Sequence, residues 1–523
     1  MSSSTPVERS SAPLDSGRIP TDARDEDAVD VGSELPSVET SHAGEGESVS
    51  IPPPSAQVAS ELKIDTSKNP YALVLRIALP TVLAMLSQSM VNEIDNFFFG
   101  YLPEPERSNA QAALFPSLVL LWMFGGSLSA ISVGTQAIAA RRFAEGRYRK
   151  SGEVLVNSWM FSLVASVVTT AIAYALTPSI LKFALPSTEV RAAAQSFLNW
   201  RLLGIASMVV TFSFKAFFDG LGKTHVHMVS ALVMNALNIF LCWVFIFGKL
   251  GVPHLGIEGA GLADALCTWV GLAIMIGWTL KAKYRVPFKP FSMSGRSKSL
   301  TWDILKLSIP SGIATIAVML GFGLFSVIVG RLDAASAAQG GSANHNLAAT
   351  SVIVSILKLT FTACLAFGTA TATLVSQSMG EKKPDQAERY GWVSVRLGLM
   401  VFGVVGFLEG VVFPHQAIAF FNDSPEVMSA ALLPMRMMGI ITPLIACGMI
   451  LTQALFGAGE SVFVMIVELV LHFFCLVPLA WILGITLGFG LVGIWSAAVV
   501  YVLMLTIIMA LRFRSGRWKL RKI

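Results

Sequence analysis

Two stretches of the chain, Leu75-Arg-Ile-Ala-Leu-Pro80 and Leu305-Lys-Leu-Ser-Ile-Pro310, share one pattern, in which an apolar segment begins and reaches a proline. A glycine follows twenty residues after each proline, at Gly100 and Gly330. Three further blocks recur in the same order: Gly134-Thr135 with Gly368-Thr369, Gly220-Leu-Gly222 with Gly457-Ala-Gly459, and Gly256-Ile-Glu-Gly259 with Gly490-Leu-Val-Gly493. Four matched blocks in one order predict that the two halves of the chain are copies of one structural unit.

The apolar stretches predict an integral membrane protein. Of the 523 residues, 54% are hydrophobic and 14% are charged, whereas a soluble domain has roughly 25% charged residues. A helix needs about 20 apolar residues to cross the hydrocarbon layer. Twelve such stretches follow Tyr71, with cores at 73–98, 111–137, 154–178, 192–214, 227–247, 259–280, 305–330, 347–375, 393–414, 428–452, 462–484 and 491–511. We therefore predict an all-α integral membrane fold of twelve transmembrane helices. Since each repeat has six, the two six-helix bundles are related by a pseudo-twofold axis along the membrane normal.

The distribution of Lys and Arg predicts the orientation. Basic residues concentrate on the cytoplasmic side of membrane proteins, and here they cluster within 141–150, 281–306 and 512–522. These segments share one side if twelve helices alternate, so we expect both termini to be cytoplasmic in a plasma or inner membrane. The predicted units are an acidic tail (1–69), a first bundle (70–282), a basic linker (283–303), a second bundle (304–512) and a basic tail (513–523).

The N-terminal tail differs from the rest of the chain. Residues 1–68 hold 13 Asp and Glu against 5 Lys and Arg and are rich in Ser, Pro and Gly. Such a composition cannot bury enough apolar surface to fold, so we predict a disordered cytoplasmic extension. A regulatory docking tail is the alternative.

The repeat and the absence of other motifs narrow the function. Two parallel six-helix repeats are typical of secondary transporters. The sequence contains no GxxxxGK[ST] motif, which argues against an ATP-driven pump, and its 5 Cys show no paired spacing for a disulfide framework or a CxxC metal site. We expect no enzymatic activity, no cofactor other than a coupling ion, and no nucleic-acid partner. A large bundle without transport activity, a channel and a membrane receptor are the alternatives.

The repeated blocks resemble the multidrug and toxic compound extrusion (MATE) family of antiporters over about residues 70–512. The matching segments are Leu79-Pro80 through Ile94-Asp95-Asn-Phe-Phe-Phe-Gly100, Phe143-Ala-Glu-Gly146, Leu221-Gly222-Lys-Thr224, Asn235-Ala-Leu-Asn238-Ile, Gly256-Ile-Glu-Gly-Ala260 and Gly490-Leu-Val-Gly-Ile-Trp495. The resemblance implies export of bulky, often cationic amphiphiles in exchange for H⁺ or Na⁺. It also implies a bend at Pro80 that responds to the nearby carboxylate, with a static bend as the alternative; the internal repeat makes Pro310 the matching conformational candidate.

The 73–98 stretch carries a polar stripe. Gln88, Asn92 and Asp95 share one helical face, and Glu93 lies nearly opposite Asp95. The second repeat has Val318, Phe322 and Phe325 at the positions of Gln88, Asn92 and Asp95. A packing requirement common to both bundles would keep the stripe in both, so the asymmetry favours a function. An ionisable side chain in the membrane is costly and usually functional.

The resemblance implies a partner set for Asp95. In the family this position is a membrane-embedded carboxylate, and in one branch it works with an Asn and an Asp four residues later. Here Asn238 is present, but Cys242 occupies the later position. The resemblance implies that Asp264 replaces the missing carboxylate, because the family commonly has a small polar residue near this position and its sixth helix packs close to the first and fifth. Two close carboxylates cannot both be ionised cheaply, so such a pair forms a proton site. With Asn238, the same cluster is an alternative Na⁺ site, and a helix-start or loop-facing role is the alternative for Asp264.

The second bundle offers weaker candidates. Glu468 and His472 lie four residues apart, one turn along a helix, and match Ala231 and Asn235 of the first repeat. We interpret them as cavity residues or a second proton relay, with a structural pair as the alternative. The other family branch uses carboxylates within the stretches corresponding to 305–330 and 428–452, where this chain has none in the apolar cores, so the first bundle is our candidate for ion coupling.

Together these features predict a secondary active multidrug exporter that works by alternating access. We place ion coupling at Asp95, Glu93, Asn238 and Asp264, and substrate or cavity contacts at Gln88, Asn92, Asn235, Glu468 and His472. The expected partners are small amphiphilic molecules and the lipid bilayer, and the expected state is a monomer. A flippase for lipid-linked precursors or polysaccharides is the alternative, but such a carrier needs a basic cavity.

Overall fold

The computed structural model describes residues 69–185, 187–338 and 345–521. These ranges are helical with no strand, which confirms the all-α prediction. Ten helices are long and apolar enough to cross a membrane, and two bent helix pairs raise the number of spans to as many as twelve in the described chain. The predicted disorder of the N-terminal segment concerns residues that lie outside the described ranges.

The first bundle contains the first six spans. Two of them are bent pairs, Glu106–Phe124 with Gly126–Ala144 at 44° and Thr188–Arg201 with Gly204–Gly220 at 49°. In chain order its elements are α2 (Pro70–Ser89), α3 (Val91–Phe99), α4 (Glu106–Phe124), η1 (Gly126–Ala130), α5 (Ile131–Ala144), α6 (Tyr148–Ala184), α7 (Thr188–Arg201), α8 (Gly204–Gly220), α9 (His225–Phe247) and α10 (Gly256–Thr279).

The second bundle follows two short elements, α11 (Ala282–Phe288) and η2 (Met293–Gly295). The eleventh span of the chain, which lies in this bundle, contains two π-helical segments, η4 and η5. In chain order its elements are α12 (Lys298–Ala338), α13 (His345–Gly380), α14 (Pro384–Phe407), η3 (Leu408–Val412), α15 (Pro414–Phe421), α16 (Pro425–Ala458), α17 (Ser461–Val470), η4 (Leu471–Leu476), α18 (Val477–Trp481), η5 (Ile482–Thr486), α19 (Gly490–Arg514) and η6 (Arg517–Leu520).

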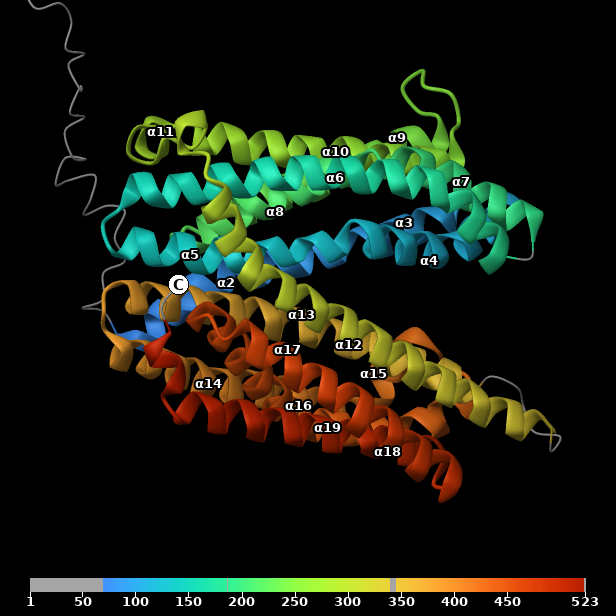
Figure 1. The fold of residues 1–523 in the computed structure, drawn as a ribbon. Coiled ribbons are helices and arrows are strands. Elements are labelled where there is room, and N and C mark those ends of the chain that lie inside the picture. The colour runs from blue at the N-terminus through green and yellow to red at the C-terminus, as the bar shows by residue number, and fades with distance from the viewer. Residues whose placement is uncertain (1–68, 186, 339–344, 522–523) are drawn as a thin grey trace, which may run out of the picture. The chain divides into compact units, whose positions relative to one another are not determined.

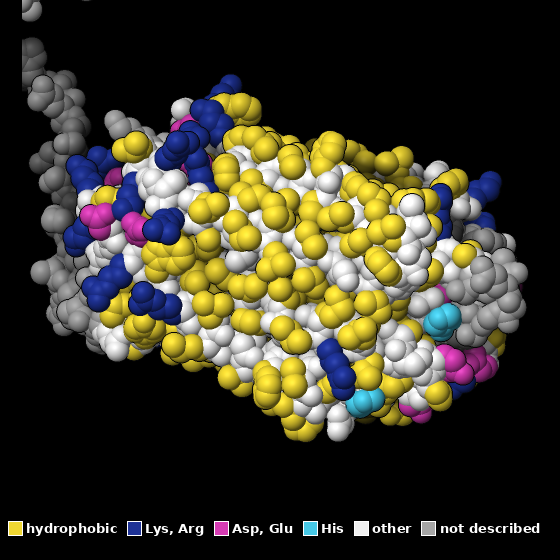
Figure 2. All heavy atoms as spheres, turned by 90° about the horizontal axis from the view of Figure 1, so that it is seen from below, with side chains coloured by type: hydrophobic (Ala, Val, Ile, Leu, Met, Phe, Trp, Pro, Cys, Tyr) yellow, Lys and Arg dark blue, Asp and Glu magenta, His cyan; other side chains and the backbone are white. Residues whose placement is uncertain are grey.

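The two bundles lie side by side, and α2, α5, α12 and α13 pack between them (Figure 1). We call the end of the helices that holds the loop after α5, the α10–α12 connection and the C-terminus the basic end. Figure 2 shows Lys and Arg gathered at this end, while apolar side chains cover the middle of the visible face. Met400, Phe407 and Ile440 are among the exposed large apolar residues of the described chain. An apolar belt of this kind is the surface that a bilayer covers.

The first helix of each half packs its opening turns into the other bundle. Leu73, Val74 and Ile77 of α2 belong to the apolar core of the second bundle. Leu300 and Ile304 of α12 belong to a core cluster of the first bundle. The two matched segments that end at Pro80 and Pro310 are therefore the places where the chain crosses between bundles.

Polar side chains join the bundles near the basic end. Gln136 Nε2 donates to Thr369 O and Thr373 Oγ1, both at 2.9 Å. Gln377 Nε2 donates to Gly220 O at 2.6 Å, and Arg141 Nη2 donates to Ala458 O at 2.8 Å. The last carbonyls of a helix have no partner within the helix. Side chains of the opposite bundle thus complete the ends of α8 and α16, at the repeated glycine turns.

The predicted basic linker, residues 283–303, packs closely on the first bundle. Phe288 is buried against Phe143, Tyr148 and Phe217. A Cβ at Gly152 would lie 1.7 Å from Phe288 O, so only glycine permits this approach. The helix of the seventh span begins at Lys298, inside this segment, because the Ser297 hydroxyl accepts a hydrogen bond from Leu300 N.

The first span is interrupted at Met90, and α2 continues through Pro80. Pro80 has no backbone N–H to donate within the helix. In the turn before it, Ile77 O accepts hydrogen bonds from Thr81 Oγ1 and Thr224 Oγ1, both at 3.0 Å. Met90 N–H turns back to Ser87 O at 3.2 Å, which ends α2 in a tight turn. In the second half, α12 likewise continues through Pro310.

Candidate functional site

A buried polar cluster lies inside the first bundle, where four helices meet. Asp95 comes from α3, Arg201 from the end of α7, Asn238 and Cys242 from α9, and Asp264 from α10. Asp95 and Cys242 are 0% exposed, Asn238 and Asp264 are 1% exposed, and Arg201 is 8% exposed. Two carboxyl groups and a guanidinium group are thus enclosed together away from water.

The interruption of the first span sets the position of Asp95. The Asn235 side chain of α9 donates to the carbonyl and to the hydroxyl of Ser87, at the end of α2. The amide thus supports the chain where the regular helix stops. Because α3 starts afresh after Met90, Asp95 is carried by a separate short helix that also packs against α9.

Small residues bring α10 close to the fourth span. A Cβ at Gly261 would lie 2.4 Å from Phe197 O, and a Cβ at Gly204 would lie 2.9 Å from Thr268 Oγ1. Small residues allow membrane helices to approach closely. This approach places Asp264, one turn beyond Gly261, against Arg201.

The distances define two contacts around the Asp264 carboxyl group and one around the Asp95 carboxyl group. Arg201 Nε lies 3.0 Å from Asp264 Oδ2, in an ion pair without hydrogen-bond alignment. Asn238 Nδ2 donates to Asp264 Oδ1 at 2.7 Å. Cys242 Sγ donates to Asp95 Oδ1 at 3.6 Å, whereas Asp95 Oδ2 is buried with no hydrogen-bond partner in the described chain. Asp264 therefore has a cation and an amide, and Asp95 has a thiol.

The cluster also has the spacing of a cation site. One ligand atom from each of Asp95, Cys242 and Asp264 lies within 4.8 Å of the others. Hard cations prefer several oxygen ligands, whereas a thiol is a soft ligand that selects other metals. Arg201 already occupies the side of Asp264 Oδ2. The thiol and the neighbouring guanidinium therefore make these three residues a poor match for a hard metal ion.

The structure does not bring Glu93 to this cluster. Its carboxylate points away from Asp95 and lies 3.1 Å from Lys358 Nζ of α13, with side chains 66% and 46% exposed. Gln88 is half-buried at the end of α2, and the side chain of Asn92 lies outside the described part of the chain. Two predicted ion-coupling residues of the first span are thus separated: Asp95 lies inside the first bundle, and Glu93 contacts the second bundle.

A second buried polar group lies in the second bundle. Tyr501 O–H donates to Glu468 Oε2 at 3.0 Å, and His472 Nδ1 lies 3.4 Å from the same oxygen and 2.8 Å from Glu468 O. A Cβ at Gly321 would lie 2.4 Å from His472 Cδ2. His472 belongs to the π-helical segment η4, a conformation that is frequent at functional sites.

Arg201 is the member of the cluster that the sequence interpretation missed. It lies in the predicted 192–214 stretch, and a cation within a predicted span is itself a signal, because such residues usually have a buried partner. Its partner Asp264 lies on the sixth span. The sequence alone does not place these two spans in contact at this depth.

Comparison with known proteins places the chain in a family. The family model described as MatE matches residues 80–244 and 310–482. A probable multidrug resistance protein NorM from Thermotoga maritima is 25% identical over 456 residues, covering 86% of this chain and 93% of that protein. A similar fold occurs in a multidrug resistance MATE family transporter in an outward-facing conformation, with a TM-score of 0.78, 20% identity, and coverage of 88% of this chain and 99% of that one.

A MOP superfamily transporter from Pyrococcus furiosus, described as having a binding pocket of reverse polarity, also shares the fold. Its TM-score is 0.76 at 22% identity, and the match covers 88% of this chain and 98% of that chain. The family model spans both halves of the chain and more than half of its length. The chain therefore belongs to the MatE family, whose members have the twelve-span, two-bundle fold described above.

Proposed function

We propose that the chain is a proton-coupled exporter of amphiphilic, often cationic compounds, with Asp95 as its proton site and its basic end in the cytoplasm. The observation that carries the proposal is the buried Asp95 carboxyl, whose Oδ2 has no partner in the described chain, beside an Asp264 that is already paired with Arg201. The multidrug name of the bacterial relatives supports the substrate class.

The charges of the cluster favour a proton on Asp95. With both carboxyl groups ionised, the site holds two negative charges and one positive charge. An uncompensated charge inside the membrane costs several kcal/mol. Asp264 keeps its charge because Arg201 and Asn238 stabilise it, so a single proton on Asp95 neutralises the remaining charge.

The same contacts favour H⁺ over Na⁺ as the coupling ion. A Na⁺ ion would need oxygen ligands from both carboxylates, yet Arg201 lies 3.0 Å from Asp264 Oδ2 and repels a second cation. The position where another branch of the family is expected to have a carboxylate holds Cys242, which is a poor ligand for a hard ion. We therefore propose exchange of drug for protons.

Loss of the proton would draw Asp95 toward Arg201, because two carboxylates then compete for one guanidinium. The helix that carries Asp95 is the short α3, which is separated from α2 by the turn at Met90. The same helix carries Glu93, which contacts Lys358 of the second bundle. We propose that α3 pivots at Met90 and transmits the charge of Asp95 to the contact between the bundles.

The contacts at the basic end support an arrangement closed on the cytoplasmic side. Gln136, Arg141 and Gln377 join the two bundles there through buried hydrogen bonds. In the proposed cycle, protonation from the opposite side releases the drug outward, and proton loss to the cytoplasm accompanies drug loading. The positive-inside distribution of Lys and Arg supports this orientation.

The alternative function, transport of a lipid-linked precursor, needs a cationic cavity for a diphosphate. Arg201 is a buried cation of the described first bundle, but Asp264 pairs with it. The cluster therefore offers no available cation for the diphosphate that a flippase would carry.

The proposal is tested by ethidium transport in proteoliposomes that hold the purified full-length protein. A pH gradient or a Na⁺ gradient is imposed separately, with and without an ionophore that collapses it. We expect uphill ethidium movement with the pH gradient only, and its loss in Asp95→Asn. Transport that follows the Na⁺ gradient would refute proton coupling, and transport that follows neither gradient would refute antiport.

A further inference from the structure

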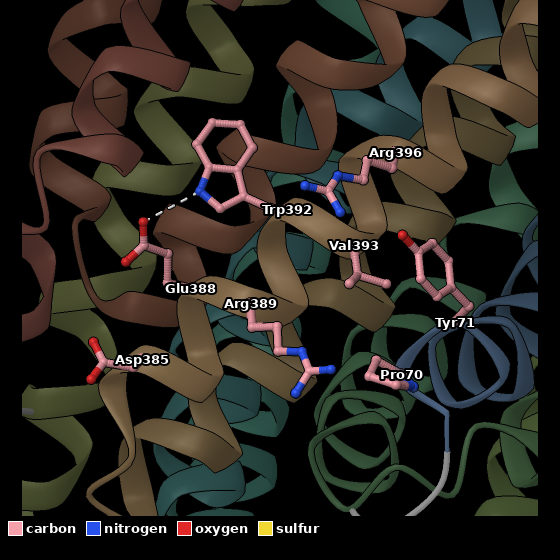
Figure 3. A pocket seen from close by; sticks show the side chains of 8 residues that line it. All are labelled: Pro70, Tyr71, Asp385, Glu388, Arg389, Trp392, Val393 and Arg396. Atoms are coloured by element: carbon pink, nitrogen blue, oxygen red, sulfur yellow. Dashed lines mark hydrogen bonds between the residues drawn. The ribbon is translucent and has the colours of Figure 1, made fainter.

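A pocket of about 390 Å³ opens at the basic end, between the start of α2 and the first turns of α14 (Figure 3). Pro70 and Tyr71 of α2 form one wall, and Arg389, Trp392 and Arg396 of α14 are among the residues of the other. It lies apart from the buried Asp95 cluster, and neither the proposed function nor the family assignment gives it a role.

The pocket is lined by two carboxylates and two guanidinium groups, and Lys519 beside it brings the local sum to one positive charge. The carboxylates, Asp385 and Glu388, pair with Lys519 Nζ of η6 at 2.8 and 2.6 Å. These hydrogen bonds raise the pKa of Lys519 above its ordinary value, so the lysine stays charged. No ion pair reaches Arg389 or Arg396 from the described residues. Among the described residues the two guanidinium groups thus have no ion-pair partner, and the two carboxylates of the lining pair with Lys519 instead.

The spacing of three and four residues places Arg389, Trp392 and Arg396 on one face of α14. Figure 3 shows the two guanidinium groups on either side of Val393, with the Tyr71 hydroxyl directed toward Arg396. Arginines present planar donors that match phosphate oxygens. A phosphate group between these side chains would receive donors from both helices.

The position of the pocket in the membrane points to the source of the phosphate. Just beyond Arg396, the exposed residues of α14 become apolar, with Leu399, Met400 and Val404 facing outward. Long basic side chains at such a border extend to the headgroup layer, where Trp and Tyr also concentrate. Basic pockets on the cytoplasmic side of membrane proteins bind anionic headgroups.

We propose that this pocket binds the phosphate of an anionic phospholipid from the leaflet at the basic end, through Arg389, Arg396 and Tyr71. A bound lipid would hold the start of α2 against α14. Since the opening turns of α2 pack into the core of the second bundle, the lipid would stabilise this crossing.

The test measures the thermal stability and lipid binding of the purified full-length protein in uncharged detergent. Phosphatidylglycerol and phosphatidylcholine are titrated, with inorganic phosphate and glycerol phosphate as soluble controls. Arg389→Gln/Arg396→Gln is compared with Arg514→Gln/Arg517→Gln, which removes the same charge from exposed positions at the same end. Ethidium transport in phosphatidylcholine vesicles confirms that each variant is folded.

We expect phosphatidylglycerol, but not phosphatidylcholine, to raise the unfolding temperature of the wild type and of the control variant. In Arg389→Gln/Arg396→Gln the apparent affinity should fall at least about tenfold, since two charge-assisted contacts are removed. Equal stabilisation of this variant, or equal stabilisation of the wild type by soluble phosphate, would overturn the lipid site. Glu61 and Asp65 are the last acidic residues of the N-terminal tail. If phosphatidylglycerol stabilised Glu61→Gln/Asp65→Asn but not the wild type, the lipid site would be overturned, because the tail and not a lipid would then occupy the pocket of the wild type.

Discussion

Arg201 determines the charge balance of the buried cluster, because it is the cation that pairs with Asp264. Removing one partner of a buried ion pair typically costs about 3–5 kcal/mol, since the other charge stays buried alone. We predict a loss of this size for Arg201→Gln and a clearly smaller loss for Arg201→Gln/Asp264→Asn. Reversible unfolding of the purified variants in detergent measures both. A double variant as unstable as the single one would show that the pair does not set the charge balance.

Asp95 and Cys242 are neighbours with different expected roles. Asp95→Asn removes the proposed proton site at nearly constant volume, so proton-driven ethidium export should be lost while the protein remains folded. Cys242→Ala removes only a weak thiol donor at 3.6 Å and should retain most of the transport. Initial export rates in vesicles with equal protein content test this pair. Export by Asp95→Asn at the rate of Cys242→Ala would contradict the assignment.

Glu93 provides a contrast on the same helix. Its exposed pair with Lys358 is worth about 0.2–1 kcal/mol. We predict that Glu93→Gln keeps proton-driven export, because the exchanged proton lies on Asp95, and lowers its rate, because the contact of α3 to Lys358 is weakened. A complete loss of coupling in Glu93→Gln would show that the proton site extends to this face of α3.

The sequence predicted some residues of the buried cluster and missed others. The polar stripe indicated Asp95, and the missing carboxylate at Cys242 directed attention to Asp264, which the structure places within 4.8 Å of Asp95. Glu93 was placed with the ion-coupling residues although periodicity sets it nearly opposite Asp95, and in the structure it contacts Lys358 of the second bundle. Helical spacing alone does not say which face meets which bundle. Arg201 was missed because its partner lies on another span, and that contact depends on how two helices pack.

At the scale of elements, the approach of α10 to α7 depends on Gly261. A Cβ there would lie 2.4 Å from the backbone oxygen of Phe197, which cannot move without shifting the helix. We predict that Gly261→Ala destabilises the protein by about 1–3 kcal/mol. Gly277, on the same helix, has open space around it. Gly277→Ala should be neutral or stabilising by up to about 1 kcal/mol. Equal effects in the two variants would contradict the packing argument.

The positions of most spans were predictable, whereas their breaks were not. Apolar length indicated twelve spans, and the structure has up to twelve in the described chain. The interruption at Met90 involves neither glycine nor proline. At this point Asn235 contacts Ser87 from a distant part of the sequence. Such tertiary support leaves no local signal in the interrupted segment.

In the whole molecule, the duplicated proline segments mark where the opening turns of one helix from each half pack into the other bundle. The opening turns of α2 belong to the core of the second bundle, and those of α12 to a core of the first. The repeat in the sequence predicted two similar bundles that are related by a pseudo-twofold axis along the membrane normal. It did not predict this packing, because matched segments reveal common ancestry of the halves and not which half each helix end contacts.

The basic end provides a pH test of the closed arrangement. Burial alone would raise the pKa of Glu460, but hydrogen bonds and charges from Arg512 and Arg521 lower it below its ordinary value of 4.5. Arg521 O in turn accepts a hydrogen bond from Arg141 of the first bundle at 3.1 Å. Because the folded pKa is depressed, the stability from this contact is present above pH 4.5 and is lost as the pH falls through the lower folded value.

We therefore predict that acidification below pH 4.5 lowers the unfolding temperature more steeply in the wild type than in Glu460→Gln. Thermal unfolding of both proteins across this range measures the difference in slope. Parallel curves would show that Glu460 does not contribute an ionised pair to the basic end.

The most direct test of proton exchange at Asp95 is a count of the protons released when the purified protein binds a drug in weakly buffered detergent solution. We predict release of about one proton per bound ethidium from the wild type, no release from Asp95→Asn, and no effect of Na⁺ on either, since one carboxyl of the cluster holds the exchangeable proton. Unchanged release from Asp95→Asn, or drug binding without proton release in the wild type, would contradict it.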